Sequence, residues 1–125
     1  MAFEALGRHA VPGPWVESAA YLPRALGREV EGIATVAVPP HVPHALDADV
    51  ADEVYVGSTL TTDVGARLAS VDPARRLFEV AGEGEVDEAA FDLAVLATAA
   101  QAPRRRRAGA RRLGDLCQAA QAVRP

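Results

Sequence analysis

The sequence lacks several features on which particular classes of protein depend. It has one cysteine, Cys117, so no internal disulfide can form, which agrees with a reducing compartment. No window approaches the roughly 20 consecutive apolar residues of a membrane-spanning helix. The first residues, MAFEALGRHAVPG, do not show the basic and then apolar order of a secretory signal. We therefore expect a cytoplasmic protein that does not enter the membrane.

Lysine and asparagine are absent, and aromatic residues make up only 5% of the chain. All 13 basic residues are arginine, a bias typical of GC-rich coding sequences, so each arginine is weaker evidence for function than usual. The apolar residues are mostly Ala, Val and Leu, which predicts a core built from small side chains. A chain of this length fits one domain and buries roughly 65 to 70% of its unfolded surface.

The charges divide into an acidic body and a basic tail. Residues 1–100 carry six arginines and sixteen acids, a net charge of −10, whereas residues 101–125 carry seven arginines and one acid, a net charge of +6. The run 104–107 suits phosphate binding, but a solvated tail is the favoured explanation. No aromatic residues alternate with the arginines as nucleic-acid binding would favour. We expect one domain over 1–100, then a basic linker and a short amphipathic helix over 101–125.

Prolines and glycines divide the first part of the chain into short elements. The stretch PWVESAAYLPRALGREVEG predicts a helix over 14–30, kinked or broken at Pro23, which lacks a backbone donor. Residues 33–38 read as a short strand that ends at a proline pair. In HALDADVADEV, Leu46, Val50 and Val54 recur at helical spacing and predict another short helix.

The second half of the chain predicts strands. Apolar and polar residues alternate from Leu60 to Leu68, which favours a strand over 59–71 with one buried face and with Gly65 as a possible bulge. The turn residues VDPAR and a return strand over 76–81 follow. FDLAVLAT, residues 91–98, is apolar on both faces and predicts a central strand. The expected fold is therefore α+β, with an antiparallel sheet packed on the helix 14–30.

The stretch VGSTLTTDVGARLASVDPARRLFEV, residues 56–80, resembles the second half of the hotdog-fold acyl-CoA thioesterases and hydratases. The resemblance implies a hotdog-like sheet around a central helix, a homodimer, an acyl-CoA-like ligand and no cofactor. It also implies a catalytic carboxylate on the central helix, for which Glu17 and Glu29 are the candidates. The candidate ligand-binding residues are Ser58, Arg104 and Arg105.

Two other functions remain open at this point. FDLAVLATAA resembles a strand of the flavin and nicotinamide disulfide-type oxidoreductases, with Ala99 where those enzymes have glycine. Since no GxGxxG fingerprint is present, the chain would be a partial domain of that kind and would not bind the dinucleotide alone. The second alternative is a non-catalytic protein that binds a partner through its C-terminal helix.

Each candidate residue also has a structural explanation. An acid such as Glu17 in the first turn of a helix complements the helix dipole without any catalysis, and Cys117 lies on an apolar stripe where free cysteine packs as a small hydrophobe. His41 and His44 are separated by a proline and have no third ligand at metal spacing, so we predict no metal site. Ser18 and Ser58 have no GxSxG motif, which disfavours a serine hydrolase.

Overall fold

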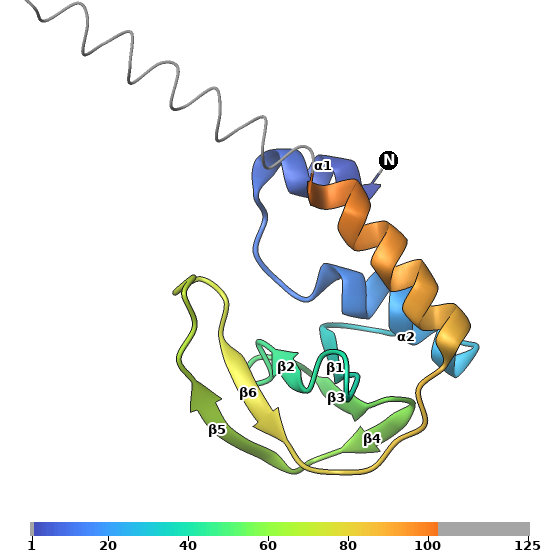
Figure 1. The fold of residues 1–125 in the computed structure, drawn as a ribbon, viewed down its shortest axis with the longest axis vertical. Coiled ribbons are helices and arrows are strands. Elements are labelled where there is room, and N and C mark those ends of the chain that lie inside the picture. Colours follow the sequence, from blue (N-terminus) through green and yellow to red (C-terminus); the bar gives the residue numbers. More distant parts are fainter. Residues whose placement is uncertain (1, 103–125) are drawn as a thin grey trace, which may run out of the picture. The chain divides into compact units, whose positions relative to one another are not determined.

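The computed structural model describes residues 2–102, which form two compact units. The larger comprises residues 12–97, and the smaller comprises residues 2–11 and 98–102 (Figure 1). The architecture is mixed α and β, as predicted. Arg104, Arg105, Cys117 and the expected C-terminal helix lie outside the described residues.

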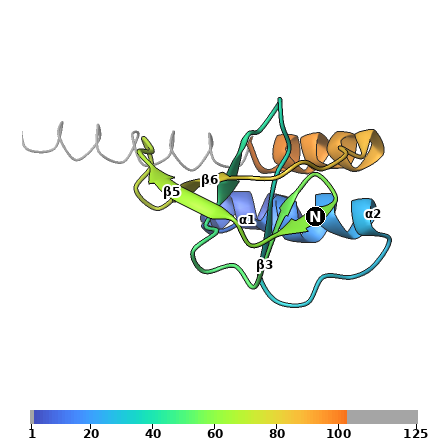
Figure 2. The same cartoon turned by 90° about the horizontal axis from the view of Figure 1, so that it is seen from below.

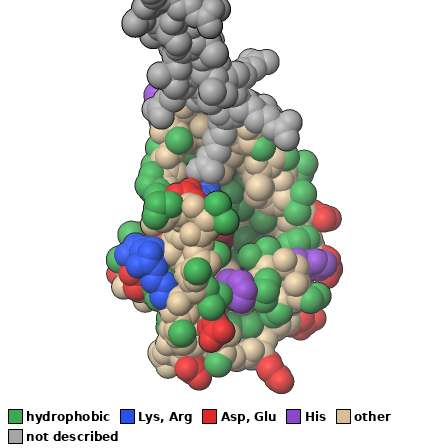
Figure 3. Space-filling view, turned by 60° about the vertical axis from the view of Figure 1, so that its left-hand side comes forward, with side chains coloured by type: hydrophobic (Ala, Val, Ile, Leu, Met, Phe, Trp, Pro, Cys, Tyr) green, Lys and Arg blue, Asp and Glu red, His purple; other side chains and the backbone are tan. Residues whose placement is uncertain are grey.

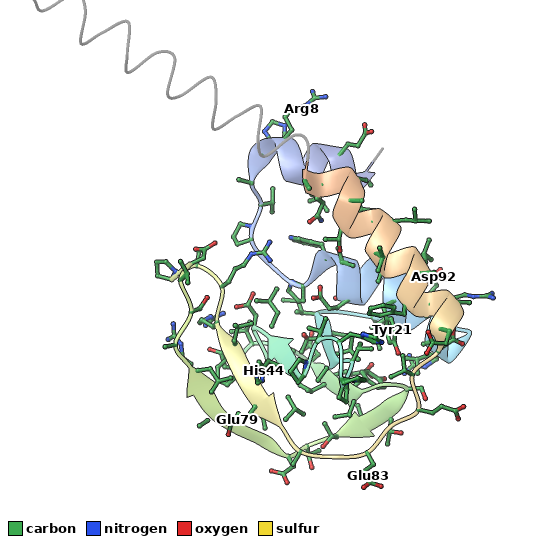
Figure 4. All side chains as sticks on the ribbon, viewed as in Figure 1. Arg8, Tyr21, His44, Glu79, Glu83 and Asp92 are labelled. Atoms are coloured by element: carbon green, nitrogen blue, oxygen red, sulfur yellow. The ribbon has the colours of Figure 1, made fainter. Side chains whose placement is uncertain are left out.

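The smaller unit contains a helix that the sequence analysis did not predict. Helix α1 (Ala2–His9) begins with Glu4 in its first turn and ends with Arg8 and His9, an order of charges that complements the helix dipole (Figure 4). Its one buried residue is Gly7, which lies against the backbone of Gln101. A side chain at position 7 would collide with that backbone, so the close approach of the two segments requires glycine.

The predicted helix over 14–30 is a shorter helical segment, residues 15–26, with a π-helical turn in it. The π turn η1 (Glu17–Tyr21) leads directly into α2 (Leu22–Leu26), and the N–H of Leu22 donates to the carbonyl of Glu17, five residues earlier. Pro23 explains the irregularity, because its ring would clash with the carbonyl of residue 19 in a regular α-helix. The segment ends at Gly27, whose φ of 65° is left-handed. Residues 28–30 were predicted to be helical, but they lie outside the helix.

Six strands form two sheets where one antiparallel sheet was predicted. In the first sheet, of order β1-β3-β4, β1 pairs with β3 in parallel and β3 pairs with β4 as a hairpin. The second sheet, of order β2-β6-β5, is antiparallel throughout. Figure 1 and Figure 2 both show the β5–β6 hairpin at the opposite end of this unit from α2. The strands are β1 (Ala34–Ala37), β2 (His44–Leu46), β3 (Glu53–Val56), β4 (Thr59–Thr61), β5 (Val64–Leu68) and β6 (Leu77–Val80).

The strand predicted over 59–71 is two strands, β4 and β5, that belong to different sheets. Thr61 interrupts the ladder, because its hydroxyl accepts the N–H of Asp63 and donates to the carbonyl of Ala81. The predicted bulge at Gly65 is confirmed: four residues of β5, from Val64 to Arg67, lie opposite three of β6, from Phe78 to Val80. The predicted turn and return strand are also confirmed, and Asp72 accepts the N–H of Ala74 at 3.0 Å.

The helix predicted over 46–54 is wrong. The chain leaves β2 at Leu46, reverses through residues 47–50 and enters β3 at Glu53. Asp47 adopts a left-handed φ of 53°, and its carbonyl accepts the N–H of Val50 at 3.1 Å, which closes the turn. The acidic residues of this stretch therefore lie in a turn between strands, although the apolar residues Leu46, Val50 and Val54 recur at helical spacing.

The central strand predicted over 91–98 is wrong too, since a helix runs from residue 88 to residue 102. Asp87 caps it: its Oδ1 accepts the N–H of Ala90 at 2.7 Å. Alanine has the highest helix propensity, and the more buried positions, Ala90, Ala94 and Ala97, follow helical spacing. The large apolar residues Leu93 and Leu96 are exposed, which explains why the segment looked apolar on both faces of a strand.

The larger unit has two clusters of buried residues, and β3 contributes to both. Its Tyr55 packs with residues of the helical segment, of β1 and of the helix that starts at residue 88. Its neighbour Val54 points to the other face, where it packs with Ala45, Ala48 and Phe78. This alternation is what a strand covered on both faces requires. The first cluster comprises Tyr21, Leu22, Ala34, Val36, Val38, Tyr55 and Ala90.

We predict that Gly84→Ala destabilises the fold by about 2 kcal/mol or more, because the new methyl group would occupy the position of the Val56 carbonyl oxygen on β3. The adjoining residue Glu85 accepts hydrogen bonds from Ser58, so moving this segment away would also break those bonds. Urea unfolding measures the effect. Gly65→Ala is the control: its methyl group would approach the Glu79 Cβ to 3.3 Å and the Glu79 carbonyl oxygen to 3.5 Å, and we expect a loss below about 1 kcal/mol. Equal losses in the two variants would contradict the assignment.

Candidate functional site

The larger unit contains a cavity of about 290 Å³. Four segments that are distant in sequence surround it: residues 12–18, residues 32–33 before β1, the turn 47–50 and residues 74–76 before β6. Most of the wall is apolar or glycine. The lining residues are Pro12, Gly13, Pro14, Trp15, Ser18, Gly32, Ile33, Asp47, Val50, Ala74 and Arg76.

Hydrogen bonds to the backbone fix two of the lining side chains. The Ser18 hydroxyl donates to the carbonyl of Ala34 at 2.5 Å and accepts the N–H of the same residue at 3.2 Å, so it joins η1 to β1. The indole Nε1 of Trp15 donates to the carbonyl of Pro12 at 2.8 Å. The Ser18 hydroxyl and the Trp15 indole N–H both donate to backbone carbonyls, so neither has a hydrogen left for a ligand in the cavity. Ser18 is therefore not arranged as a nucleophile.

A charged cluster forms the polar part of the wall. Asp47 is only 5% exposed, and its Oδ1 accepts the backbone N–H of Arg76 at 3.3 Å and the guanidinium Nε at 3.2 Å. Asp49 accepts the Nη1 of the same arginine at 2.6 Å. In return, the backbone N–H of Asp47 donates to the carbonyl of Arg76 at 2.7 Å. The cluster therefore holds the turn 47–50 against the start of β6.

Glu17, the first residue of η1 and the neighbour of Ser18, is the predicted site residue with the clearest electrostatic signature. Burial raises the pKa of its carboxyl group, and the negative charge of Asp47 adds to the rise. A backbone hydrogen bond and the positive charge of Arg75 act in the opposite direction without cancelling it. A carboxyl group with a raised pKa exchanges protons closer to neutral pH, which suits a general acid or base.

None of the predicted site residues in the described part of the chain lines this cavity, although Glu17 directly precedes Ser18, which does. Glu29 is exposed in the loop after α2, and its carbonyl accepts a hydrogen bond from Arg28. Ser58 lies in the two-residue turn between β3 and β4, where its N–H and hydroxyl both donate to the carbonyl of Glu85. Neither residue lines the cavity.

The histidines are also placed apart from the cavity. His41 stacks on Phe91 with ring centroids 4.6 Å apart, and His44 lies on β2 opposite Glu79 (Figure 4). Among residues 2–102, no three His, Cys, Asp or Glu side chains are grouped in a way that could hold a metal ion. Trp15, Asp47 and Arg76 line the cavity, and Glu17 adjoins it as the neighbour of Ser18. Sequence reasoning did not join these residues, because Asp47 and Arg76 meet across 29 residues of chain.

Comparison with protein-family models, with curated proteins and with solved structures found no match. In the described part of the chain, no helix combines the length and the apolar character needed to cross a bilayer.

We predict that Glu17→Gln raises the free energy of unfolding at pH 7 to 8. Because burial raises the pKa in the folded state, the folded protein holds the Glu17 proton more tightly than the unfolded chain does. The stability that this proton provides is complete below the unfolded value of 4.5 and is lost as the pH rises through the folded pKa. Urea unfolding at several pH values measures the difference between the two proteins, which should shrink on acidification.

The matched control is Glu29→Gln, which makes the same chemical change at an exposed side chain and should alter stability by less than about 0.5 kcal/mol. A Glu17→Gln protein that is less stable than the native chain at pH 8 would show that the backbone hydrogen bond and the positive charge of Arg75 together outweigh burial.

Proposed function

We propose that residues 12–97 bind a small acyl compound in the cavity, and that an acyl thioester is the ligand class. The observation that carries the proposal is the composition of the wall. Proline, tryptophan, isoleucine, valine and alanine side chains form most of it, and its polar side chains already bond to one another or to the backbone. Such a wall favours an apolar group, because it offers contact area with few unused hydrogen-bonding groups.

The volume of the cavity limits which part of a ligand enters. At about 290 Å³ it lies at the small end of ligand pockets, which span roughly 300 to 1,000 Å³. A short acyl chain fits this space, and the carrier of the acyl group stays outside.

Glu17 supplies the chemistry that thioester hydrolysis needs. In its ionised form the carboxylate accepts a proton from a water molecule, whose oxygen attacks the thioester carbonyl carbon. The carbon–sulfur bond then breaks, and the thiolate leaves and takes up a proton from solvent. The raised pKa makes Glu17 a stronger base than an exposed glutamate.

We predict that a short neutral thioester, S-hexanoyl-N-acetylcysteamine, changes the fluorescence of Trp15 in a saturable way. Trp15 is the single tryptophan of the chain and lines the cavity, so the signal reports on this site directly. Val50→Asp should weaken binding, because it places a charge in the apolar wall. The control Leu60→Asp changes an exposed apolar residue that does not line the cavity. N-acetylcysteamine without its acyl group should not bind.

Thiol release measures turnover in the same samples. Glu17→Gln should lower the rate of release and leave the binding titration in place. A native protein that gives no saturable signal with the thioester would contradict the proposal.

The hotdog resemblance also implies a homodimer. The homodimer is a separate prediction. Light scattering should give a solution mass near twice the 13.1 kDa of the chain. A monomer at working concentration would remove the homodimer and leave the single-chain site to be tested alone.

A further inference from the structure

Large apolar side chains remain exposed around the mouth of the cavity. Trp15 is 41% exposed, Ile33 is 44% exposed and Val50 is 49% exposed, and all three line the cavity. These residues come from three different segments of the chain, so the fold gathers them at one place. A tryptophan beside a pocket is a common anchor point in protein interfaces. The face drawn in Figure 3 also shows apolar side chains exposed among charged ones.

Two acidic segments border this apolar surface. Residues 29–33 and 47–53 are joined by hydrogen bonds, since the N–H of Asp52 donates to the carbonyl of Ile33 and the N–H of Ile33 donates to the Asp52 carboxylate. The two segments contain six acids and no basic residue. Arg76 pairs with Asp47 and Asp49, and Arg28 pairs with Glu53. Exposed Glu29, Glu31 and Asp52 make no ion pair with any other described residue.

We propose that the cavity and its acidic border bind a basic segment of another protein, which inserts one apolar side chain into the cavity between arginine or lysine residues. This inference does not rest on acyl binding. The apolar side chain gains contact area with Trp15, Ile33 and Val50, and the flanking cations meet the carboxylates of Glu31 and Asp52. The cavity volume suits one side chain and leaves the backbone of the partner at the surface.

The charge of the chain favours this occupant over others. Residues 1–100 carry a net charge of −10, so the acidic border of one copy repels the same border of a second copy. The same border repels nucleic acids and anionic lipid surfaces, whereas the arginines of residues 101–125 carry the opposite charge. A basic segment is attracted, and its attraction weakens as salt screens the charges.

The test uses three pentapeptides, RRLRR, RRARR and EELEE, titrated into the full chain while the fluorescence of Trp15 is recorded. RRLRR should bind in a saturable way. RRARR should bind about tenfold more weakly or worse, because it lacks the apolar group that fills the cavity. EELEE should not bind. Raising the salt from 50 to 500 mM should weaken RRLRR binding several-fold.

Two protein variants locate the site. Val50→Ser should weaken RRLRR binding about fivefold or more, and Glu31→Gln should reduce the salt dependence, because both side chains are exposed and can change without loss of the fold. Leu60→Ser, at an exposed apolar residue that does not line the cavity, is the control and should bind like the native chain.

Several results would overturn the proposal. Equal binding of RRLRR and RRARR would show that charge alone attracts the peptides, and equal binding by the native and Val50→Ser proteins would place the contact elsewhere. A saturable signal with the hexanoyl thioester but none with RRLRR would make the cavity a small-molecule site only. A dimer that Val50→Ser dissociates would show that a second copy covers this surface.

Discussion

The contact between Asp47 and Arg76 holds together the part of the molecule on which the candidate site depends. Asp47 is almost fully buried, so its charge needs a partner. Its carboxylate accepts hydrogen bonds from the backbone N–H and the guanidinium Nε of Arg76, and its own N–H donates to the carbonyl of Arg76. These bonds hold Asp47 in a left-handed backbone conformation. Removing one member of such a pair typically costs about 3 to 5 kcal/mol, because the other charge stays buried and unpaired. Since both residues also line the cavity, the interaction that joins the turn 47–50 to β6 is also the one that shapes the wall.

How much of the fold the sequence could predict depended on whether local chemistry decided the structure. The β5–β6 hairpin was predictable, because alternation, the turn residues around Pro73 and the bulge at Gly65 all act within the hairpin itself. The Gly57-Ser58 turn carries a similar local signal, a two-residue loop with glycine at a positive φ, although no hairpin was predicted there. Residues 91–98 fit either a buried strand or a helix by apolar pattern alone, and the cap at Asp87 and the alanine spacing decide for the helix. The turn 47–50 depends on Arg76, which no local pattern reveals.

The same distinction applies to the site. Glu17 was a candidate through a family resemblance, and the structure gives it a raised pKa through burial and through Asp47, which lies 30 residues further along the chain. Ser58 shows the reverse case. It was a candidate ligand-binding residue, but in the fold its hydroxyl donates to the backbone carbonyl of Glu85. The resemblance therefore named one group with a raised pKa, but neither it nor residue spacing could identify the walls of the cavity, because each wall comes from a different segment.

The two occupants considered for the cavity must meet one physical requirement. Whatever enters has to place an apolar group against Trp15, Ile33 and Val50, and whatever remains outside lies beside Glu31 and Asp52. A carrier with several phosphates, such as coenzyme A, would bring negative charge to that acidic border and lose binding free energy there. A neutral or cationic carrier avoids the repulsion. If the ligand is an acyl compound, the border therefore selects against a polyanionic carrier, and the same border attracts a basic protein segment. For either proposed occupant, the border would set the charge selectivity of the cavity and the apolar wall would provide the affinity.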